Sequence, residues 1–330
     1  MAAAGRVVRG PGRRRQTLES VISIVAPVFA LGFLGYLSTR LGWFSDEAAG
    51  GLARFVFDFA VPLMLVRVFV HAELPSTFPW PLLASFYLPA AVLYAAGILV
   101  SGRLFGRDLM GRTIGGFSCS FGNAVLLGLP LALLSFDEAG MVPFLILLSV
   151  HGLGYLTVTT GLLEYGRQQG QPWSRLPLAV GRGMVTNPII LGLAVGVSMN
   201  QAGLTLPGPV DRTLEYMQAA VTPCALFSLG ASLTRCRIAG GLAEPLVAVA
   251  LKTVLMPVTV WVLAVHMLAL PTQWSQAAIL LAAQPTGVNV YLFAVRYAAA
   301  KELATTTVFL ATSFSLISLS LVLYLLPLMT

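Results

Sequence analysis

Two short stretches combine asparagine, glycine and proline inside otherwise apolar segments. The first reads Gly122-Asn123-Ala124-Val125-Leu126-Leu127-Gly128-Leu129-Pro130, and the second reads Gln284-Pro285-Thr286-Gly287-Val288-Asn289. Proline removes a backbone donor and clashes with the preceding helical turn, whereas glycine tolerates unwound backbone. We therefore expect Gly128, Pro130 and Pro285 to break the two helices that carry these stretches.

A break in each helix would create a polar site in an apolar setting. The second half of a broken helix begins with free amide groups and carries about half a positive charge at that end. Two such ends favour an anion, and the side chains of Asn123 and Asn289 add neutral donors. The candidate substrate-binding residues are Asn123, Asn289, Gly287 and Thr286. The alternative is a pair of ordinary kinked helices whose asparagines bond across a packing interface.

Asp58 is the acidic residue that this reasoning singles out. A charge at the bilayer centre costs about 2.5–3.5 kcal/mol on insertion scales, so an intramembrane acid is a functional candidate. Arg54 precedes Asp58 by four residues, and the two can pair on one helix face. Asp58 is thus a candidate for coupling transport to a proton or a cation. The alternative is a structural ion pair near a helix end.

The other ionisable and sulfur-containing residues indicate no further site. Lys252 and Arg67 are long enough to reach a polar interface from within a membrane. His151 is isolated in an apolar segment and is most simply a packed residue. The three histidines and three cysteines show no metal-ligand spacing, so we expect no metal and no cofactor.

The composition indicates which elements position these residues. Hydrophobic residues make up 57% of the chain and charged residues 10%, against about 25% charged in a typical soluble domain. Uncharged runs cover 82–101, 183–210, 271–295 and 303–330. About 20 apolar residues let a helix cross a bilayer, and nothing alternates as barrel strands do. We expect an all-α membrane protein with ten spans, at 19–39, 48–71, 79–101, 112–135, 140–163, 183–201, 211–234, 243–268, 273–298 and 302–328.

Several residues recur at equivalent positions in the two halves of the chain. Five pairs of landmark residues recur at an offset of 161 to 168 residues: Pro27 and Pro188, Pro62 and Pro223, Pro89 and Pro257, Asn123 and Asn289, Glu138 and Glu302. Five crossings per half is an odd number, so the second copy would be inverted, which is a transporter device. We expect a basic disordered arm at 1–17, a first repeat at 18–163, a cytoplasmic connector at 164–182 and a second repeat at 183–330.

At these residues the sequence resembles the auxin efflux carrier family, which includes bacterial malonate-type carriers and the plant PIN proteins. The matching pieces run through the whole chain: Pro27 with Leu31-Gly32-Phe33-Leu34-Gly35-Tyr36, Ala60-Val61-Pro62-Leu63, Asn123 with Gly128 and Pro130, Asn187-Pro188-Ile189-Ile190, Pro223 with Leu229-Gly230-Ala231-Ser232-Leu233, and Pro285-Thr286-Gly287-Val288-Asn289 with Ala294 and Arg296-Tyr297. The resemblance implies a ten-helix inverted-repeat fold whose fourth and ninth helices cross at their breaks. It also implies carriage of carboxylates at that crossing.

The expected function is secondary transport of small organic anions by alternating access, in the plasma or inner membrane. The expected partners are the organic anion, the lipid bilayer and a coupling proton or sodium ion; whether the chain forms a homodimer stays open. The net charge of +7 lies mostly in loops and the N-terminal arm, where it indicates topology and no nucleic-acid partner. Two alternatives remain: a sodium-coupled symporter of the bile-acid type, and an intramembrane hydrolase. An aspartyl hydrolase would need a second acid facing Asp58, and a serine hydrolase would need a serine beside His151.

Overall fold

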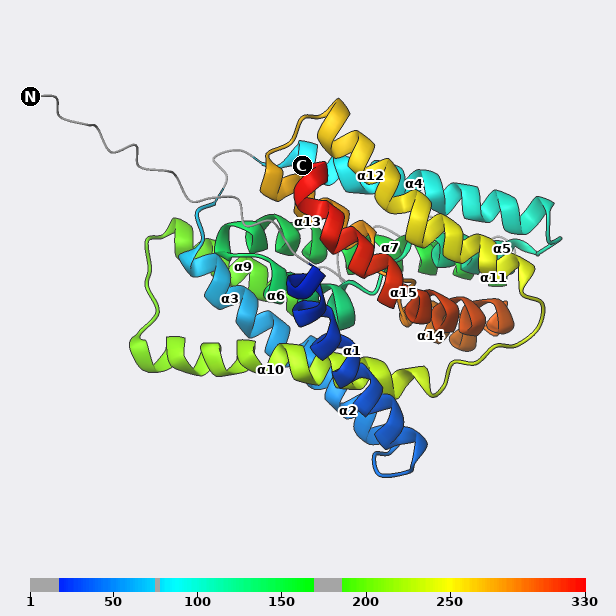
Figure 1. Ribbon diagram of the computed structural model, residues 1–330, viewed down its shortest axis with the longest axis horizontal. Helices are drawn as coiled ribbons and strands as arrows, with labels where there is room; N and C mark the ends of the chain where they lie inside the picture. Colours follow the sequence, from blue (N-terminus) through cyan, green and yellow to red (C-terminus); the bar gives the residue numbers. More distant parts are fainter. Residues whose placement is uncertain (1–17, 75–77, 169–185) are drawn as a thin grey trace, which may run out of the picture.

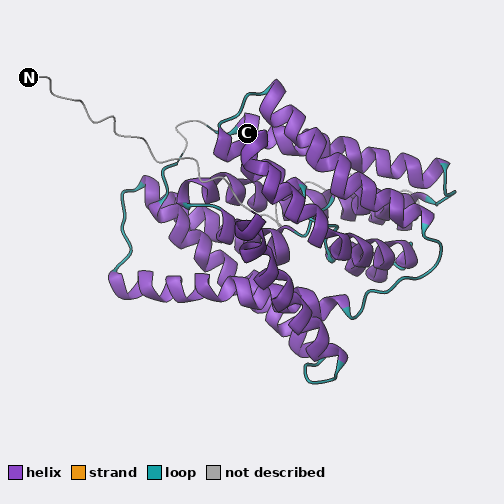
Figure 2. Ribbon diagram, in the orientation of Figure 1, coloured by secondary structure: helices purple, strands orange, loops and turns teal. Residues whose placement is uncertain are grey.

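The computed structural model describes residues 18–74, 78–168 and 186–330, and every named element within those ranges is a helix (Figures 1 and 2). The arm at 1–17 and most of the connector at 164–182 lie outside the described residues. The α-helices of the described residues are α1 (Leu18–Arg40), α2 (Asp46–Phe55), α3 (Val61–His71), α4 (Trp80–Arg103), α5 (Leu109–Ser120), α6 (Leu129–Ser135), α7 (Glu138–Gln168), α9 (Pro188–Gln201), α10 (Gly208–Leu233), α11 (Ala243–Ala250), α12 (Met256–Trp261), α13 (Thr272–Ala282), α14 (Asn289–Arg296) and α15 (Lys301–Met329).

Within the described ranges, five helical stretches are long and apolar enough to cross a membrane. They are Val21–Arg40, Trp80–Arg103, Ala139–Arg167, Ala243–Met267 and Lys301–Met329. Large apolar side chains also stay exposed, among them Phe33, Trp43 and Leu328. Such an exterior is costly in water and favourable against lipid chains. The structure is therefore that of an all-helical membrane protein.

Three π-helical turns each lead into a proline. The turn η1 (Val56–Ala60) precedes Pro62, η2 (Ala124–Gly128) precedes Pro130, and η4 (Leu251–Leu255) precedes Pro257. A proline ring clashes with the carbonyl four residues earlier, and a wider turn moves that carbonyl away. These prolines therefore lie just after a wider turn in helical segments that continue past them.

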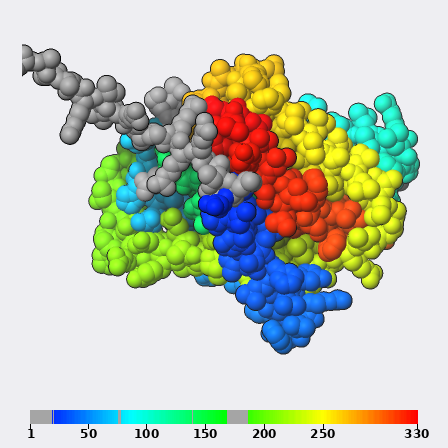
Figure 3. Space-filling view, viewed as in Figure 1, coloured from blue at the N-terminus to red at the C-terminus, as the bar shows by residue number. Residues whose placement is uncertain are grey.

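The helices form two groups. One contains α1, α2, α3, α9 and α10, which pack mainly on one another, and the other contains α4, α5, α7 and α11 to α15. The segment η2–α6 lies between them, in contact with α1 and α10 on one side and with α7 and α13 on the other. Figure 3 shows α1 lying against the C-terminal helix α15 on one face of the molecule. The boundary between the two groups is where the cavity described below is found.

Glycines set the close contact between α1 and α10. A Cβ atom added to Gly230 would overlap the carbonyl oxygen of Gly32, and one added to Gly35 would overlap that of Phe227. Small residues let helix backbones approach in this way, and the approach is a main source of helix association in lipid. The first helix group is thus held together by backbone contacts as well as by side chains.

Candidate functional site

Two helices are interrupted at the same place and touch there. Helix α5 ends at Ser120 and the helical path resumes at Ala124, while α13 ends at Ala282 and α14 begins at Asn289. The intervening segments pair as an antiparallel bridge between Gly122 and Thr286. The Asn123 N–H donates to the Pro285 carbonyl at 2.8 Å, and the Gly287 N–H donates to the Phe121 carbonyl at 3.1 Å. Each break therefore satisfies part of the free backbone of the other.

Thr286 and Gly287 hold this crossing together. The Thr286 hydroxyl is fully buried and donates to the Ser118 carbonyl at 2.9 Å. A Cβ atom on Gly287 would lie 2.6 Å from the ring of Phe121 and 3.0 Å from the carbonyl oxygen of Gly122. Both residues were expected to bind substrate, but the structure places them in the crossing, outside the wall of the neighbouring cavity.

Two of the three residues that were expected to break the helices lie outside the interruptions. Gly128 and Pro130 have helical neighbours and follow the break, since Gly128 ends η2 and Pro130 sits in the first turn of α6. Gly128 packs closely on Gln284, whose Cγ would lie 3.1 Å from an added Cβ. Of the three expected helix breakers, only Pro285 lies inside an interruption, where its carbonyl accepts the bond from Asn123.

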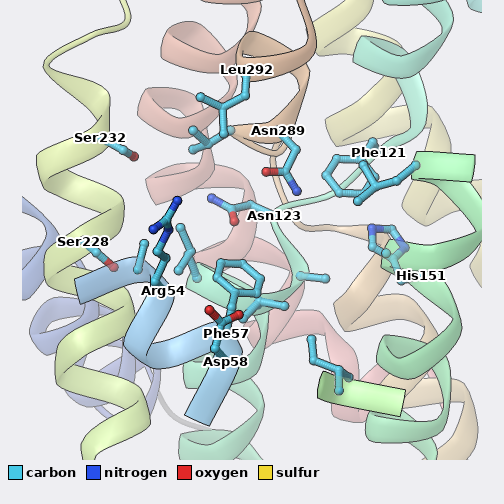
Figure 4. A pocket seen from close by; sticks show the side chains of 18 of the residues that line it. Arg54, Phe57, Asp58, Phe121, Asn123, His151, Ser228, Ser232, Asn289 and Leu292 are labelled. Carbon is cyan, nitrogen blue, oxygen red and sulfur yellow. The ribbon is translucent and has the colours of Figure 1, made fainter. Parts of the chain in front are cut away.

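A cavity of about 590 Å³ opens beside the crossing, between the two helix groups (Figure 4). Its wall is built from both groups and from the start of each second half-helix. The side chains that could contact a ligand through polar atoms come from Arg54, Asp58, Asn123, Ser149, His151, Thr186, Asn187, Ser228, Ser232, Arg235, Asn289 and Tyr291. Small-molecule sites are usually apolar cavities of this size with a few convergent polar groups.

Asn123 and Asn289 lie next to one another in the cavity wall (Figure 4). Asn123 is only 5% exposed, and within the described residues its Nδ2 atom has no hydrogen-bond partner. Buried polar atoms are almost always paired, so an unpaired donor facing a cavity indicates room for a ligand group or a water. η2 begins directly after Asn123, and α14 begins at Asn289. Amide side chains and helix ends therefore present positive polarity to one volume.

Arg54 is a cavity residue whose role the sequence did not indicate. Figure 4 shows its side chain directed into the cavity, above Asp58. Among the ion pairs of the described residues none joins Arg54 to Asp58, although the i,i+4 spacing allowed one. Asp58 lies in the π-helical turn η1, where the helix repeat changes. The second arginine of the wall, Arg235, is paired with Asp46 at 3.1 Å.

His151 packs against the interruption that follows α5. It is 1% exposed, its Nε2 lies 3.2 Å from the carbonyl oxygen of Gly122, and its ring stacks on Phe121 with centroids 4.8 Å apart. The neighbouring Tyr155 hydroxyl donates to the Ser120 carbonyl at 3.0 Å. These contacts fit the packing role expected for His151 and satisfy carbonyl groups at the interrupted end of α5.

Among the described residues of the wall, the groups expected for intramembrane hydrolysis do not come together. Asp58 is the only carboxylate among the described residues of the wall, whereas an aspartyl mechanism uses two. The Ser149 hydroxyl donates to the Leu145 carbonyl, and no serine donates to His151 among the hydrogen bonds of the described residues. No cluster of metal ligands occurs in the described part of the chain.

Comparison with known proteins gives consistent results along the whole chain. A sequence model of the family described as "Membrane transport protein" matches residues 20–323. A protein of Rhizobium meliloti (strain 1021), named "Putative malonate transporter", is 28% identical over 93% of this chain and 96% of its own length. The "Auxin efflux carrier component 8" of Arabidopsis thaliana is 23% identical over 87% of this chain and 92% of its own length.

Proposed function

This chain belongs to the auxin efflux carrier family of membrane transport proteins, and from that premise we propose that it is a secondary carrier of small carboxylates. The protein is a multi-pass membrane protein. In the proposal its ten spans form two inverted repeats of five, and the fourth and ninth spans supply the site. The pairing of the two interruptions and their equivalent places in the two halves support this arrangement.

One observation carries the proposal: two half-helix N-termini and two asparagine amides face one cavity. Helix N-termini bind anions through free amide groups and the helix dipole, and amide side chains add donors without adding a compensating charge. The guanidinium of Arg54 adds a cation whose planar donors suit a carboxylate. A cavity of about 590 Å³ holds a short mono- or dicarboxylate with water. The name of the Rhizobium relative fits this substrate class.

Asp58 is the proposed coupling group. It lines the same cavity as Asn123 and Arg54, and Figure 4 shows its carboxylate below both of them. A carboxylate that takes up a proton would change the balance of charge around a bound anion, which is what coupling requires. An Asp58→Asn variant separates coupling from binding, because it keeps the shape of the side chain and removes its charge.

A flux assay on the purified full chain in proteoliposomes tests the proposal. We expect saturable uptake of malonate and of other short carboxylates, competition between them, and exchange with carboxylate loaded inside. Neutral amides of the same size should not compete, because helix ends and Arg54 select for negative charge. The absence of saturable uptake for every mono- and dicarboxylate of the panel, in either direction, would contradict the proposal.

Replacing Arg54 is expected to weaken binding of the anion without unfolding the protein. Arg54 lies in the wall and forms no ion pair among the described residues, so Arg54→Gln leaves no partner uncompensated. We expect KM for malonate to rise by about tenfold in Arg54→Gln, because one modest charge-assisted contact is lost. In Arg54→Lys, KM should rise less. Arg212→Gln, at an exposed arginine of α10 outside the cavity wall, is the matched control and should keep the KM of the native chain.

A further inference from the structure

Four glycines in the interior of the described helices have no close neighbour. A Cβ atom added to Gly50, Gly51, Gly152 or Gly154 would meet nothing within 4 Å among the described residues. Glycine is less favourable than alanine inside a helix, and in membrane helices it usually permits a close approach. Gly192 is an example, because a Cβ there would overlap the backbone of α3. Helix packing does not account for the four open glycines in this way.

Gly152 of α7 leaves an apolar gap in the wall of the cavity. Leu148 and Leu156 line the same wall, four residues before and four residues after it. Side chains four residues apart are neighbours on one face of a helix. The stripe of leucine side chains is therefore missing at its middle position, and we call this gap the notch.

The notch lies near the anion site. His151 precedes Gly152 in α7, and its Nε2 lies 3.2 Å from the carbonyl oxygen of Gly122 at the interruption. Asn123, the residue after Gly122, lines the same cavity as Gly152, is 5% exposed and has an unpaired Nδ2 among the described residues. An unpaired buried donor indicates room for a ligand group or a water. The anion site and the notch therefore belong to one volume.

The second open glycine of the cavity wall has polar surroundings. Gly50 precedes Arg54 by four residues on α2, so its open face lies next to a guanidinium. The neighbours of the notch on α7 are leucines instead. The two open faces thus give the cavity a polar part and an apolar part.

Malonate alone leaves much of this volume unfilled. Cavities of about 590 Å³ usually hold ligands considerably larger than a three-carbon diacid. A hydrocarbon group attached to the anion would displace water from the apolar part, and the burial of each methylene group is favourable.

We propose that the notch at Gly152 is a subsite for the hydrocarbon part of a substituted carboxylate. The absence of a side chain at this position then sets the size of the group that the carrier accepts. The inference rests on the proposed function, because it extends the substrate class of that same site. The carboxylate lies at the asparagines and the helix ends, and the alkyl group lies between Leu148 and Leu156.

A series of alkylated malonates tests the inference on the native chain. Uptake of radiolabelled malonate into proteoliposomes is inhibited with malonate and with methyl-, ethyl-, propyl- and butylmalonate, which keep both carboxylates and differ only in the alkyl group. We expect the inhibition constant to fall by about threefold for each added methylene group, close to the gain from burying a methylene. Inhibition constants that stay level or rise along the series would overturn the inference.

Filling the notch is the second test. In Gly152→Leu the new side chain occupies the subsite, so butylmalonate should inhibit no better than malonate. Gly152→Ala should lose part of the advantage of butylmalonate. Gly154→Leu, at an open glycine of the same helix outside the cavity wall, is the matched control and should keep the native ratio of the two inhibition constants. A native ratio in Gly152→Leu would contradict the proposed subsite.

Thiol labelling tests the notch without transport. Gly152→Cys and Gly154→Cys are each made in a Cys224→Ala background, since the other two native cysteines are buried. A charged methanethiosulfonate reagent should label Gly152→Cys, and butylmalonate should slow this labelling more than malonate does. The labelling of Gly154→Cys should respond to neither compound, because that position lies outside the cavity wall. If butylmalonate does not slow the labelling of Gly152→Cys, the inference is wrong.

The proposed function and this inference fail in different ways. If malonate is taken up and the alkyl chain gives no advantage, the function stands and the notch is not a subsite. If no carboxylate is taken up but butylmalonate protects Gly152→Cys, the proposed function fails and the subsite stands. Should Gly152→Leu not fold, the alkylmalonate series on the native chain and the labelling of Gly152→Cys decide.

Discussion

Asn123→Asp and Asn289→Asp are each expected to reduce carboxylate uptake by roughly 100-fold, because a like charge placed directly against the anion costs several kcal/mol. The substitution keeps the size of the side chain and exchanges an amide for a carboxylate. Both asparagines line the cavity, and Asn123 has an unpaired donor there. Initial rates of malonate uptake into proteoliposomes measure the effect.

Two further variants make this result specific to the site. Gln273→Glu adds a carboxylate at an exposed position of α13, on the same broken span but outside the cavity wall, and should transport at the native rate. The double variant Asn123→Ala and Asn289→Ala removes donors without adding charge and should lose affinity as well. Unchanged transport by that double variant would remove these asparagines from the site.

Gly287→Ala is the second large effect, and it acts on the crossing itself. The added methyl group would lie 2.6 Å from the ring of Phe121 and 3.0 Å from the Gly122 carbonyl, so the two interruptions would have to move apart. Displacements of this size disturb binding geometry strongly, and we expect transport to fall by more than about tenfold. Uptake rate and the melting temperature of the purified variant are both measured.

Gly241→Ala is the control for this substitution. A Cβ at Gly241 meets nothing within 4 Å and no left-handed backbone is required there, so its transport and melting temperature should match those of the native chain. If Gly287→Ala transports like the native chain, the close approach of the two breaks is not needed for function.

Much of the fold and part of the site could be predicted from the sequence. The uncharged runs predict helices in lipid because only a continuous helix satisfies its own backbone there. The combination of glycine, proline and asparagine identified both interrupted helices, and the asparagines at the start of their second halves do line one cavity. The inverted five-plus-five repeat and the boundaries of the arm and the connector stay predictions.

Other details depended on contacts that a sequence does not reveal. Pro130 was expected to break its helix, but the preceding π-helical turn makes room for the proline ring and the helix continues. Thr286 and Gly287 were expected to bind substrate, but they lie in the crossing. The sequence did not indicate this, because it does not show that the other interruption and the ring of Phe121 pack against them. The spacing of Arg54 and Asp58 allowed an ion pair, but none joins them among the described residues, because spacing along a helix does not fix where two side chains point.

The hydrogen bonds between the two interruptions also restrict how this molecule can change shape. If the crossing opened, the amides of Asn123 and Gly287 would lose their acceptors where water is scarce, at a cost of several kcal/mol. The two interruptions are therefore expected to move together. In the proposed carrier, access from one side of the bilayer and then from the other would come from movement of the whole crossing past α1 and α10, with the bound carboxylate in place.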